Sequence, residues 1–252
     1  MTAKAFDFTG KVVLVTGATR GLGRRIVQGF VDCGARVVVA SRDAAACRAT
    51  AEELTAGGAE ALPVAIDVAG WDAGADLLRQ ATEHFGQIDV LVNNAGMSPV
   101  LRRLTDLDEA GFDAIFDTNV KSVFRLSTLA AKQMAEGNGG AIVNISSTEA
   151  ILAPAAVAPY AGAKAAVETI TRGIARAYGP KVRVNAIQCG TFRTDLTAGF
   201  VDLPAFQKQV EIMNPARRVG SPEEVVGAAL YLASDLAGYT SGSVLKVDGG
   251  EA

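Results

Sequence analysis

The sequence predicts an α/β protein in which a doubly wound, mainly parallel sheet of seven strands carries helices on both faces. Two observations indicate this class. Short β-branched apolar runs alternate with helix-length amphipathic segments along almost the whole chain. The runs are apolar at consecutive positions, which is typical of strands covered on both faces. Helices between such strands act as right-handed crossovers, so the strands they join are expected to be parallel.

Each element is justified by its own stretch of sequence. The first strand, 11–16, is followed by a glycine-rich turn and a helix that closes at Gly34. The other expected strands are 35–40, 61–66, 88–93, 141–147, 183–187 and 243–247. The other expected helices are 44–56, 74–85, a long one from about 106 to 134, one from 158 onward and one at 222–233. No linker or repeat divides the sequence, so one domain is expected over 1–252.

The composition excludes several classes of function. The chain is 49% hydrophobic and 20% charged, with a net charge of −3 and scattered cations, which disfavours nucleic-acid binding. Neither a membrane-length apolar run nor a signal-peptide pattern is present, so a cytoplasmic protein with no membrane partner is expected. Three cysteines without C-x-x-C spacing and one histidine predict no metal site and a reduced compartment.

The turn after the first strand has the pattern G-x-x-x-G-x-G, formed by Gly17, Gly21 and Gly23. Glycines let the backbone approach a diphosphate, and the helix that follows offers free N–H groups at its positive end. A tight strand-to-helix corner that binds nothing is the alternative.

The end of the second strand bears on the choice of cofactor. An acidic residue there would accept from the ribose 2′-hydroxyl of NAD, whereas arginine accommodates a 2′-phosphate. Ser41 and Arg42 stand at this place, and Arg20 in the glycine turn adds a second cation, so NADP(H) is preferred. Asp43 keeps NAD(H) possible, and Arg42 could be only a solvated charge. Asp67, after the third strand, either accepts from an adenine amine or caps its own turn.

A candidate proton-transfer group lies between 147 and 164. Ser147 ends an apolar strand, and Tyr160 and Lys164 stand four residues apart, so they share one face of a helix. A nearby ammonium is expected to lower the pKa of the phenol, which could then act as a general acid or base. A tyrosine and a lysine at this spacing also occur by chance in many helices.

These motifs, together with Asn93-Asn94-Ala95-Gly96, Asn119 and the closing Val247-Asp248-Gly249-Gly250, resemble those of the classical short-chain dehydrogenases/reductases. The resemblance covers nearly the whole chain and implies a Rossmann-type fold. It implies that Tyr160 is the catalytic acid/base, that Lys164 lowers its pKa and binds the nicotinamide ribose, and that Ser147 bonds the substrate oxygen. It also implies that the backbone carbonyl of Asn119 holds a water linked to Lys164, and that the protein is a homotetramer.

The resemblance and the motifs give a set of expected cofactor contacts. These are Gly17, Thr19, Arg20, Gly21, Leu22, Gly23, Ser41, Arg42, Asp67, Val68, Asn94, Ala95, Gly96, Tyr160, Lys164, Gly190, Phe192 and Thr194.

One departure from the family pattern is Cys189, which stands where proline usually precedes Gly190 and is expected to loosen the turn. A substrate lid is expected at about 190–218. Its apolar side chains either suit a largely apolar ketone or alcohol or only pack the lid against the sheet.

The sequence therefore predicts an oxidoreductase that moves a hydride between NADP(H) and a carbonyl or secondary alcohol. The alternatives are an NAD-dependent alcohol dehydrogenase of the same family and a non-catalytic dinucleotide-binding regulatory protein.

Overall fold

One parallel sheet organises residues 6–252, the part of the chain that the computed structural model describes. Seven strands stand in the order β3-β2-β1-β4-β5-β6-β7 within these residues, and every neighbouring pair is parallel. The strands are β1 Val12–Thr16, β2 Arg36–Ser41, β3 Ala61–Ala65, β4 Val90–Asn93, β5 Gly140–Ser147, β6 Val182–Cys189 and β7 Val244–Val247. The order reverses between β1 and β4, and a ligand crevice is expected at the carboxyl ends there.

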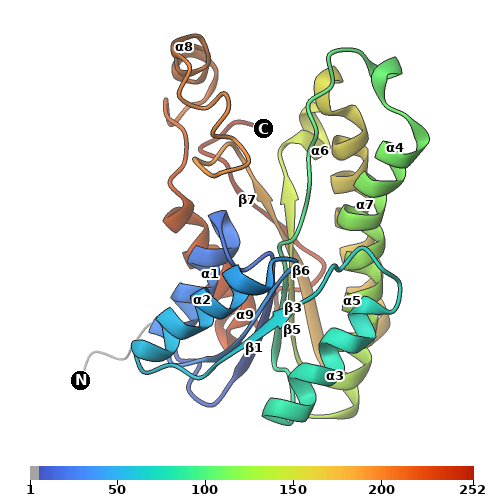
Figure 1. Cartoon of the computed structure of the whole chain (residues 1–252), viewed down its shortest axis with the longest axis vertical. Coiled ribbons are helices and arrows are strands. Elements are labelled where there is room, and N and C mark those ends of the chain that lie inside the picture. The colour runs from blue at the N-terminus through green and yellow to red at the C-terminus, as the bar shows by residue number, and fades with distance from the viewer. Residues whose placement is uncertain (1–5) are drawn as a thin grey trace.

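Helices cover both faces of the sheet (Figure 1). The helices α1 (Gly21–Asp32), α2 (Ala44–Ala56) and α9 (Val226–Ala233) lie on one side, and α3 (Ala73–Phe85), α5 (Ser122–Glu136) and α7 (Ala158–Tyr178) lie on the other. Successive residues of β1 point to opposite faces of the sheet. Val13 packs in the hydrophobic core beneath α1 and α9, and Leu14 packs in the core beneath α3 and α5. This alternation explains why the strand is apolar at every position.

The expected helix at 106–134 is the clearest correction to the predicted elements. It is divided into a 3-10 turn at Leu104–Asp106, α4 at Glu109–Phe116, a π-helical turn at Asp117–Lys121 and then α5. The π turn inserts an extra residue into the helical ladder, and such turns are common at functional sites. Amphipathic periodicity alone did not reveal this insertion.

Three further features differ from the prediction. Strand β6 continues through Cys189, two residues beyond the expected end, and Cys189 pairs with Ser147 and Val247 in the sheet. The Cys189 carbonyl oxygen also accepts from the Thr148 amide at 2.9 Å, so this residue is held at the end of the sheet. The helices α6 (Glu149–Leu152) and α8 (Pro204–Met213) were not predicted. The expected helix at 222–233 begins as a 3-10 turn, Pro222–Val225, before α9.

Candidate functional site

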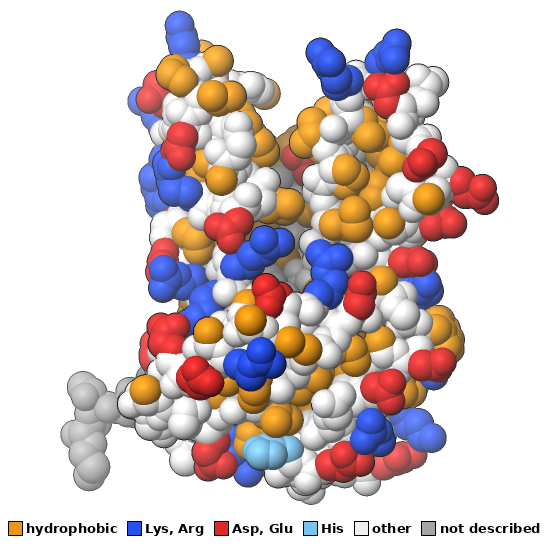
Figure 2. Space-filling model, viewed as in Figure 1, with side chains coloured by type: hydrophobic (Ala, Val, Ile, Leu, Met, Phe, Trp, Pro, Cys, Tyr) orange, Lys and Arg blue, Asp and Glu red, His pale blue; other side chains and the backbone are white. Residues whose placement is uncertain are grey.

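A deep cavity opens between two arms of the molecule at the carboxyl ends of the strands. One arm contains α8, and the other contains α4, α6 and the first turns of α7 (Figure 1). The space-filling view shows the hollow between them, with Lys and Arg side chains at its lower edge (Figure 2). The cavity has a volume of about 740 Å³ and runs from the glycine turn after β1 to Ser147 and Tyr160. A cavity of this size fits a small ligand site.

The glycine turn has the geometry of a phosphate cradle. Gly17 and Gly21 have φ angles of 63° and 53°, which L side chains rarely adopt. A Cβ on Gly17 would lie 2.8 Å from Nδ2 of Asn94, so only glycine fits there. Arg20, the N-cap of α1, makes no side-chain hydrogen bond to the helix end. The first N–H groups of α1 therefore face the cavity without a capping side chain, and these residues fit a dinucleotide diphosphate.

Gly23 has a different place from the one predicted for it. It is buried and does not line the cavity. A Cβ on Gly23 would lie 2.2 Å from the Gly17 carbonyl oxygen and 2.4 Å from Asn94 Nδ2. Asn94 donates from that nitrogen to the carbonyl oxygens of Thr16 and Gly17, at 2.9 and 3.1 Å. Gly23 thus allows α1 to pack against the turn that Asn94 holds.

Polar side chains gather where β2 and β3 end. The Thr19 hydroxyl donates to Ser41 Oγ at 3.2 Å, and Arg42 is exposed at the cavity wall. Asp43 also lines the cavity, but its Oδ1 accepts from the Ala45 and Ala46 amides and caps α2.

Asp67 holds its own turn, because its Oδ1 accepts from the Ala69 amide at 3.1 Å. It also lines the cavity, so its contact with an adenine amine stays a prediction. Of the expected cofactor contacts, the structure brings all except Gly23 to this one cavity.

Ser147, Tyr160 and Lys164 meet at the other end of the cavity. Ser147 is the last residue of β5, and its hydroxyl lies within hydrogen-bonding reach of the Tyr160 phenol. Tyr160 and Lys164 lie one turn apart near the start of α7, and the Lys164 ammonium is 5.5 Å from the centre of the tyrosine ring. The structure thus brings these three side chains together at one end of the cavity.

The predicted direction of the shift in the Tyr160 pKa is wrong. Burial raises the pKa of the phenol above its ordinary value, and the hydrogen bond with Ser147 only partly opposes this rise. Burial also lowers the pKa of Lys164 from 10.5 to about 8. The ammonium donates to the Ile145 carbonyl oxygen at 2.8 Å and does not bond to the phenol. Desolvation, rather than attraction between the ammonium and the phenol, therefore sets the direction of both pKa shifts.

Asn119 stands inside the π-helical turn and is completely buried. Its Nδ2 donates to the carbonyl oxygens of Met97 and Ile115, at 2.9 Å each, and its Oδ1 accepts from the Met97 amide at 3.4 Å. The side chain does not line the cavity. It ties the loop after β4 to the helix at the point where Gly96 passes close to Lys164.

The segment 190–218 closes the cavity on the α8 side. Its two ends pair, since the Gly220 amide donates to Thr191 O and the Arg193 amide donates to Gly220 O, both at 2.9 Å. The predicted apolar side chains divide into two groups. Phe192, Leu196 and Phe200 line the cavity. Leu203 and Met213 are exposed and lie outside it.

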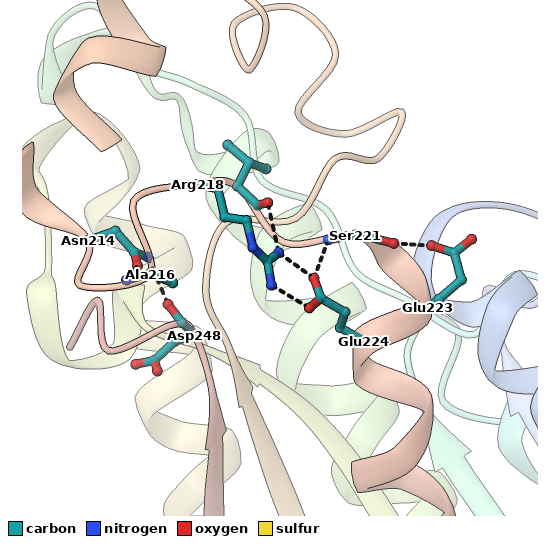
Figure 3. A network of polar contacts seen from close by, with 8 residues as sticks. Asn214, Ala216, Arg218, Ser221, Glu223, Glu224 and Asp248 are labelled. Carbon is teal, nitrogen blue, oxygen red and sulfur yellow. Dashed lines mark hydrogen bonds and ion pairs between the residues drawn. The ribbon is translucent and has the colours of Figure 1, made fainter. Parts of the chain in front are cut away.

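A polar network anchors the return of this segment to the body of the protein (Figure 3). Arg218 makes two hydrogen bonds to the Glu224 carboxylate, at 2.7 and 2.6 Å, and the Ser221 amide donates to the same carboxylate at 2.8 Å. Asn214 donates to the Asp248 carbonyl oxygen at 2.9 Å, which joins the end of α8 to the C-terminal segment.

Sequence reasoning missed two carboxylates beside the proton-transfer group. Glu149 begins α6, two residues after Ser147, and lines the cavity. Glu251 reaches the same region from the segment after β7 and accepts from the Thr191 amide at 3.0 Å and from its hydroxyl at 3.1 Å. The position of Glu149 just beyond a strand's carboxyl end was a usable signal. No sequence pattern pointed to Glu251.

Within residues 6–252 no helix is long and apolar enough to cross a membrane, and no three His, Cys, Asp or Glu side chains are grouped as metal ligands.

Comparison with known proteins gives consistent results. A family model described as enoyl-(acyl carrier protein) reductase matches residues 17–251. Gluconate 5-dehydrogenase of Gluconobacter oxydans is 36% identical over 248 residues, which cover 97% of this chain and 96% of that protein.

Two solved structures have nearly the same fold. A short-chain type dehydrogenase/reductase from Mycobacterium marinum is 37% identical with a TM-score of 0.91, over 98% of this chain and 97% of that one. A gluconate 5-dehydrogenase from Burkholderia cenocepacia, in complex with NADP and tartrate, is 31% identical with a TM-score of 0.93, over 98% and 96% of the two chains. With its parallel sheet, glycine turn and Tyr160–Lys164 pair, the chain belongs to the short-chain dehydrogenase/reductase family and is a nicotinamide-dinucleotide-dependent oxidoreductase.

Proposed function

We propose that the protein transfers a hydride reversibly between NADP(H) and the carbon of a ketone, aldehyde or secondary alcohol, with Tyr160 as the general acid/base. The observation that carries this proposal is the single cavity with a diphosphate cradle at one end and Ser147, Tyr160 and Lys164 at the other. With the diphosphate of a dinucleotide at the glycine turn, one half of the cofactor can extend to Ser147, Tyr160 and Lys164, where the chemistry takes place. The bound cofactor supplies the hydride donor or acceptor.

The protein's own side chains then have distinct roles. Tyr160 gives a proton to the substrate oxygen during reduction, or takes it during oxidation. Ser147 orients that oxygen by a hydrogen bond, since its hydroxyl lies beside the phenol. Lys164 supplies a buried positive charge one turn away, which favours the phenolate whenever the proton leaves Tyr160. Asn119 does not reach the cavity, but its side chain holds the loop at Met97 in place by a hydrogen bond.

NADP(H) is the preferred cofactor in this proposal. Arg20 and Arg42 are exposed cations on the cavity wall, and guanidinium groups bind phosphate through paired hydrogen bonds. Asp43, the carboxylate that could favour NAD, is already used in capping α2. The relative from Burkholderia cenocepacia, which is in complex with NADP, agrees with this choice.

Replacement of Tyr160 by phenylalanine tests the function. We expect kcat to fall by at least about 10²-fold in a panel of ketones and alcohols, because one general acid is worth about that much. NADPH binding, measured by calorimetry, should stay within a few-fold of the native value. Tyr178→Phe at the far end of the same helix is the matched control and should keep full turnover. Near-native turnover of Tyr160→Phe would disprove the assignment.

We also propose a cytoplasmic homotetramer in which the helical stretch from 106, now divided into α4 and α5, and the helix from 158 form contacts between subunits. Phe112 on α4 and Phe124 on α5 support this proposal, because their side chains are 44% and 43% exposed. Light scattering coupled to gel filtration measures the mass, and a monomer mass of 26.0 kDa at micromolar concentration would contradict the proposal.

A further inference from the structure

Glu149 stands at the substrate end of the cavity. Its amide donates to Ser147 Oγ at 3.2 Å, and its side chain contributes to the same wall as Tyr160. Its charge is felt at the Tyr160 phenol, where a Glu149 carboxylate raises the pKa. The carboxyl therefore lies near the place where a substrate oxygen would meet Ser147 and Tyr160.

The Glu149 carboxyl lacks a hydrogen-bond donor in the part of the chain that the structure describes. Its Oε2 is buried and receives no hydrogen bond from residues 6–252. Burial, and then the negative charge of Glu251, raises the pKa of this carboxyl above its ordinary value. A buried acceptor without a donor is unfavourable, and a donor that arrives with a ligand removes that penalty.

The neighbouring carboxylate is already satisfied. Glu251 accepts from the Thr191 amide and hydroxyl, and from the Thr148 hydroxyl at 3.4 Å. These bonds tie the segment after β7 to both chain segments that leave the carboxyl ends of β5 and β6. The Glu251 carboxyl thus lies close to Glu149 and has hydrogen-bond donors of its own. A ligand that carries its own anion would meet the Glu149 carboxyl at this wall, with the charge of Glu251 behind it.

The wall formed by the segment 190–218 differs in polarity from the wall at Glu149. Leu196 and Phe200 reach the cavity from the segment 190–218 and present apolar surface. Asp195 of the same segment also lines the cavity, so this wall is mixed. The site therefore sets apolar surface from Leu196 and Phe200 across from the Glu149 carboxyl, and the reacting atoms lie between them. Such a site orients a substrate that is apolar on one side and carries a donor on the other.

We propose that Glu149 is a specificity-determining residue, which selects substrates that carry an O–H or N–H donor beside the reacting carbon and no negative charge on that side. The inference rests on the proposed hydride transfer and adds the class of substrate. The expected substrates are hydroxy ketones, vicinal diols or amino ketones. Simple carboxylates are disfavoured, so the preference differs from that suggested by the name gluconate dehydrogenase of two relatives.

Four small ketones of similar size form the test: hydroxyacetone, aminoacetone, butanone and acetoacetate, each with NADPH. For the native enzyme we expect kcat/KM to be about 10-fold or more higher for the first two than for butanone, because a hydrogen bond to a carboxylate discriminates by about that factor. Acetoacetate should be the poorest of the four. Equal kcat/KM for butanone and hydroxyacetone, or a preference for acetoacetate, would overturn the proposal.

Two variants separate selection from a structural role. Glu149→Leu should bring the four kcat/KM values to within about 3-fold of one another, chiefly by raising KM for the donor-bearing ketones. Glu149→Gln keeps an acceptor oxygen, so it should retain the preference for hydroxyacetone and lose the preference for the cationic aminoacetone. A purely structural residue would instead lower all four values by the same factor. Glu52→Gln, an exposed carboxyl on α2, is the matched control and should match the native enzyme.

The outcomes also separate this inference from the proposed function. Turnover of all four ketones without a donor preference ends the inference and leaves the hydride transfer intact. Absence of turnover with these ketones and with the wider panel ends both. Should Glu149→Leu fail to fold, the isosteric Glu149→Gln decides alone, since an unchanged preference of this variant for aminoacetone over butanone contradicts the role of the charge.

Discussion

The Lys164 ammonium donates a hydrogen bond to the carbonyl oxygen of Ile145, 2.8 Å away on β5. The side chain is only 4% exposed, and it forms no ion pair with the carboxylates of the described residues. A single neutral acceptor therefore holds a buried cation. The energetic cost of that burial is what lowers the pKa of Lys164 to about 8.

This burial predicts how stability depends on pH. The pKa falls from 10.5 in its ordinary state to about 8 in the fold, so the unfolded chain holds more protons between these values. Stability without nucleotide should therefore rise with pH through this window, and the burial penalty is fully present below pH 8. Lys164→Met should be more stable than the native chain at pH 7, by on the order of 2–3 kcal/mol, with a difference that shrinks toward pH 10.

Urea unfolding at pH 7, 9 and 10 measures this effect. Lys132→Met, an exposed lysine on α5, should change the free energy of unfolding by less than about 0.5 kcal/mol at each pH. A Lys164→Met protein that is less stable than native at pH 7 would mean that the bond to Ile145 outweighs the cost of burying the charge.

Gly23 predicts a packing effect with a functional consequence. A methyl group there would collide with the Gly17 carbonyl oxygen at 2.2 Å and with Asn94 at 2.4 Å. Gly23→Ala should therefore displace the glycine turn, lower stability by about 1–3 kcal/mol and weaken NADPH binding at least about 10-fold. Gly227→Ala on α9 is the control, since a methyl there meets nothing within 4 Å. Calorimetric binding that is native-like in Gly23→Ala would show that the turn does not depend on this contact.

Arg42 predicts the cofactor preference. Arg42→Asp should reduce kcat/KM for NADPH by about 10-fold or more, because a carboxylate repels the 2′-phosphate that a guanidinium would bind. The effect on NADH should be small or favourable, so the ratio of the two kcat/KM values is the quantity to measure. Arg48→Asp, on α2 six residues further along and outside the cavity, makes the same change of charge and should leave the ratio unchanged. An unaltered ratio in Arg42→Asp would remove the physical basis for preferring NADP(H).

The parts of the fold that follow from periodicity and spacing were predictable. Fully apolar runs gave the strands, and the i to i+4 spacing correctly placed Tyr160 and Lys164 on one face of α7. The glycine turn could be located because positive φ angles and close approach restrict Gly17 and Gly21 to glycine. These features depend on local sequence, so the sequence alone contains the signal.

Features that depend on distant partners were not predictable. Asn144 interrupts an apolar strand, and only the fold brings it to Asn93 and Thr171, with hydrogen bonds of 2.8 Å each. The direction of the Tyr160 pKa was wrong because burial could not be judged from spacing. Glu251 was missed since it lies 60 residues from Thr191, the residue to which it bonds.

Arg218 predicts how firmly the segment 190–218 is held. Its paired hydrogen bonds lower the pKa of Glu224 to about 2, but both side chains are largely exposed, at 57% and 41%. Exposed pairs contribute no more than about 1 kcal/mol to global stability. The pair joins the returning end of this segment to the turn before α9 (Figure 3), so its loss should act locally.

Arg218→Ala should make trypsin cleave after the exposed Lys208 of α8 several-fold faster, while the free energy of unfolding in urea changes by less than about 1 kcal/mol. The Arg218→Ala variant should also raise KM for the ketone substrate more than it lowers kcat, because an open segment binds substrate less tightly.

Glu224→Ala should have the same effect, and the double variant should add little to the effect of either single variant. Arg79→Ala, which breaks an exposed ion pair with Glu83 on α3, is the control for loss of a surface charge. An Arg218→Ala protein with native cleavage and native KM would show that the segment is held by its apolar contacts alone.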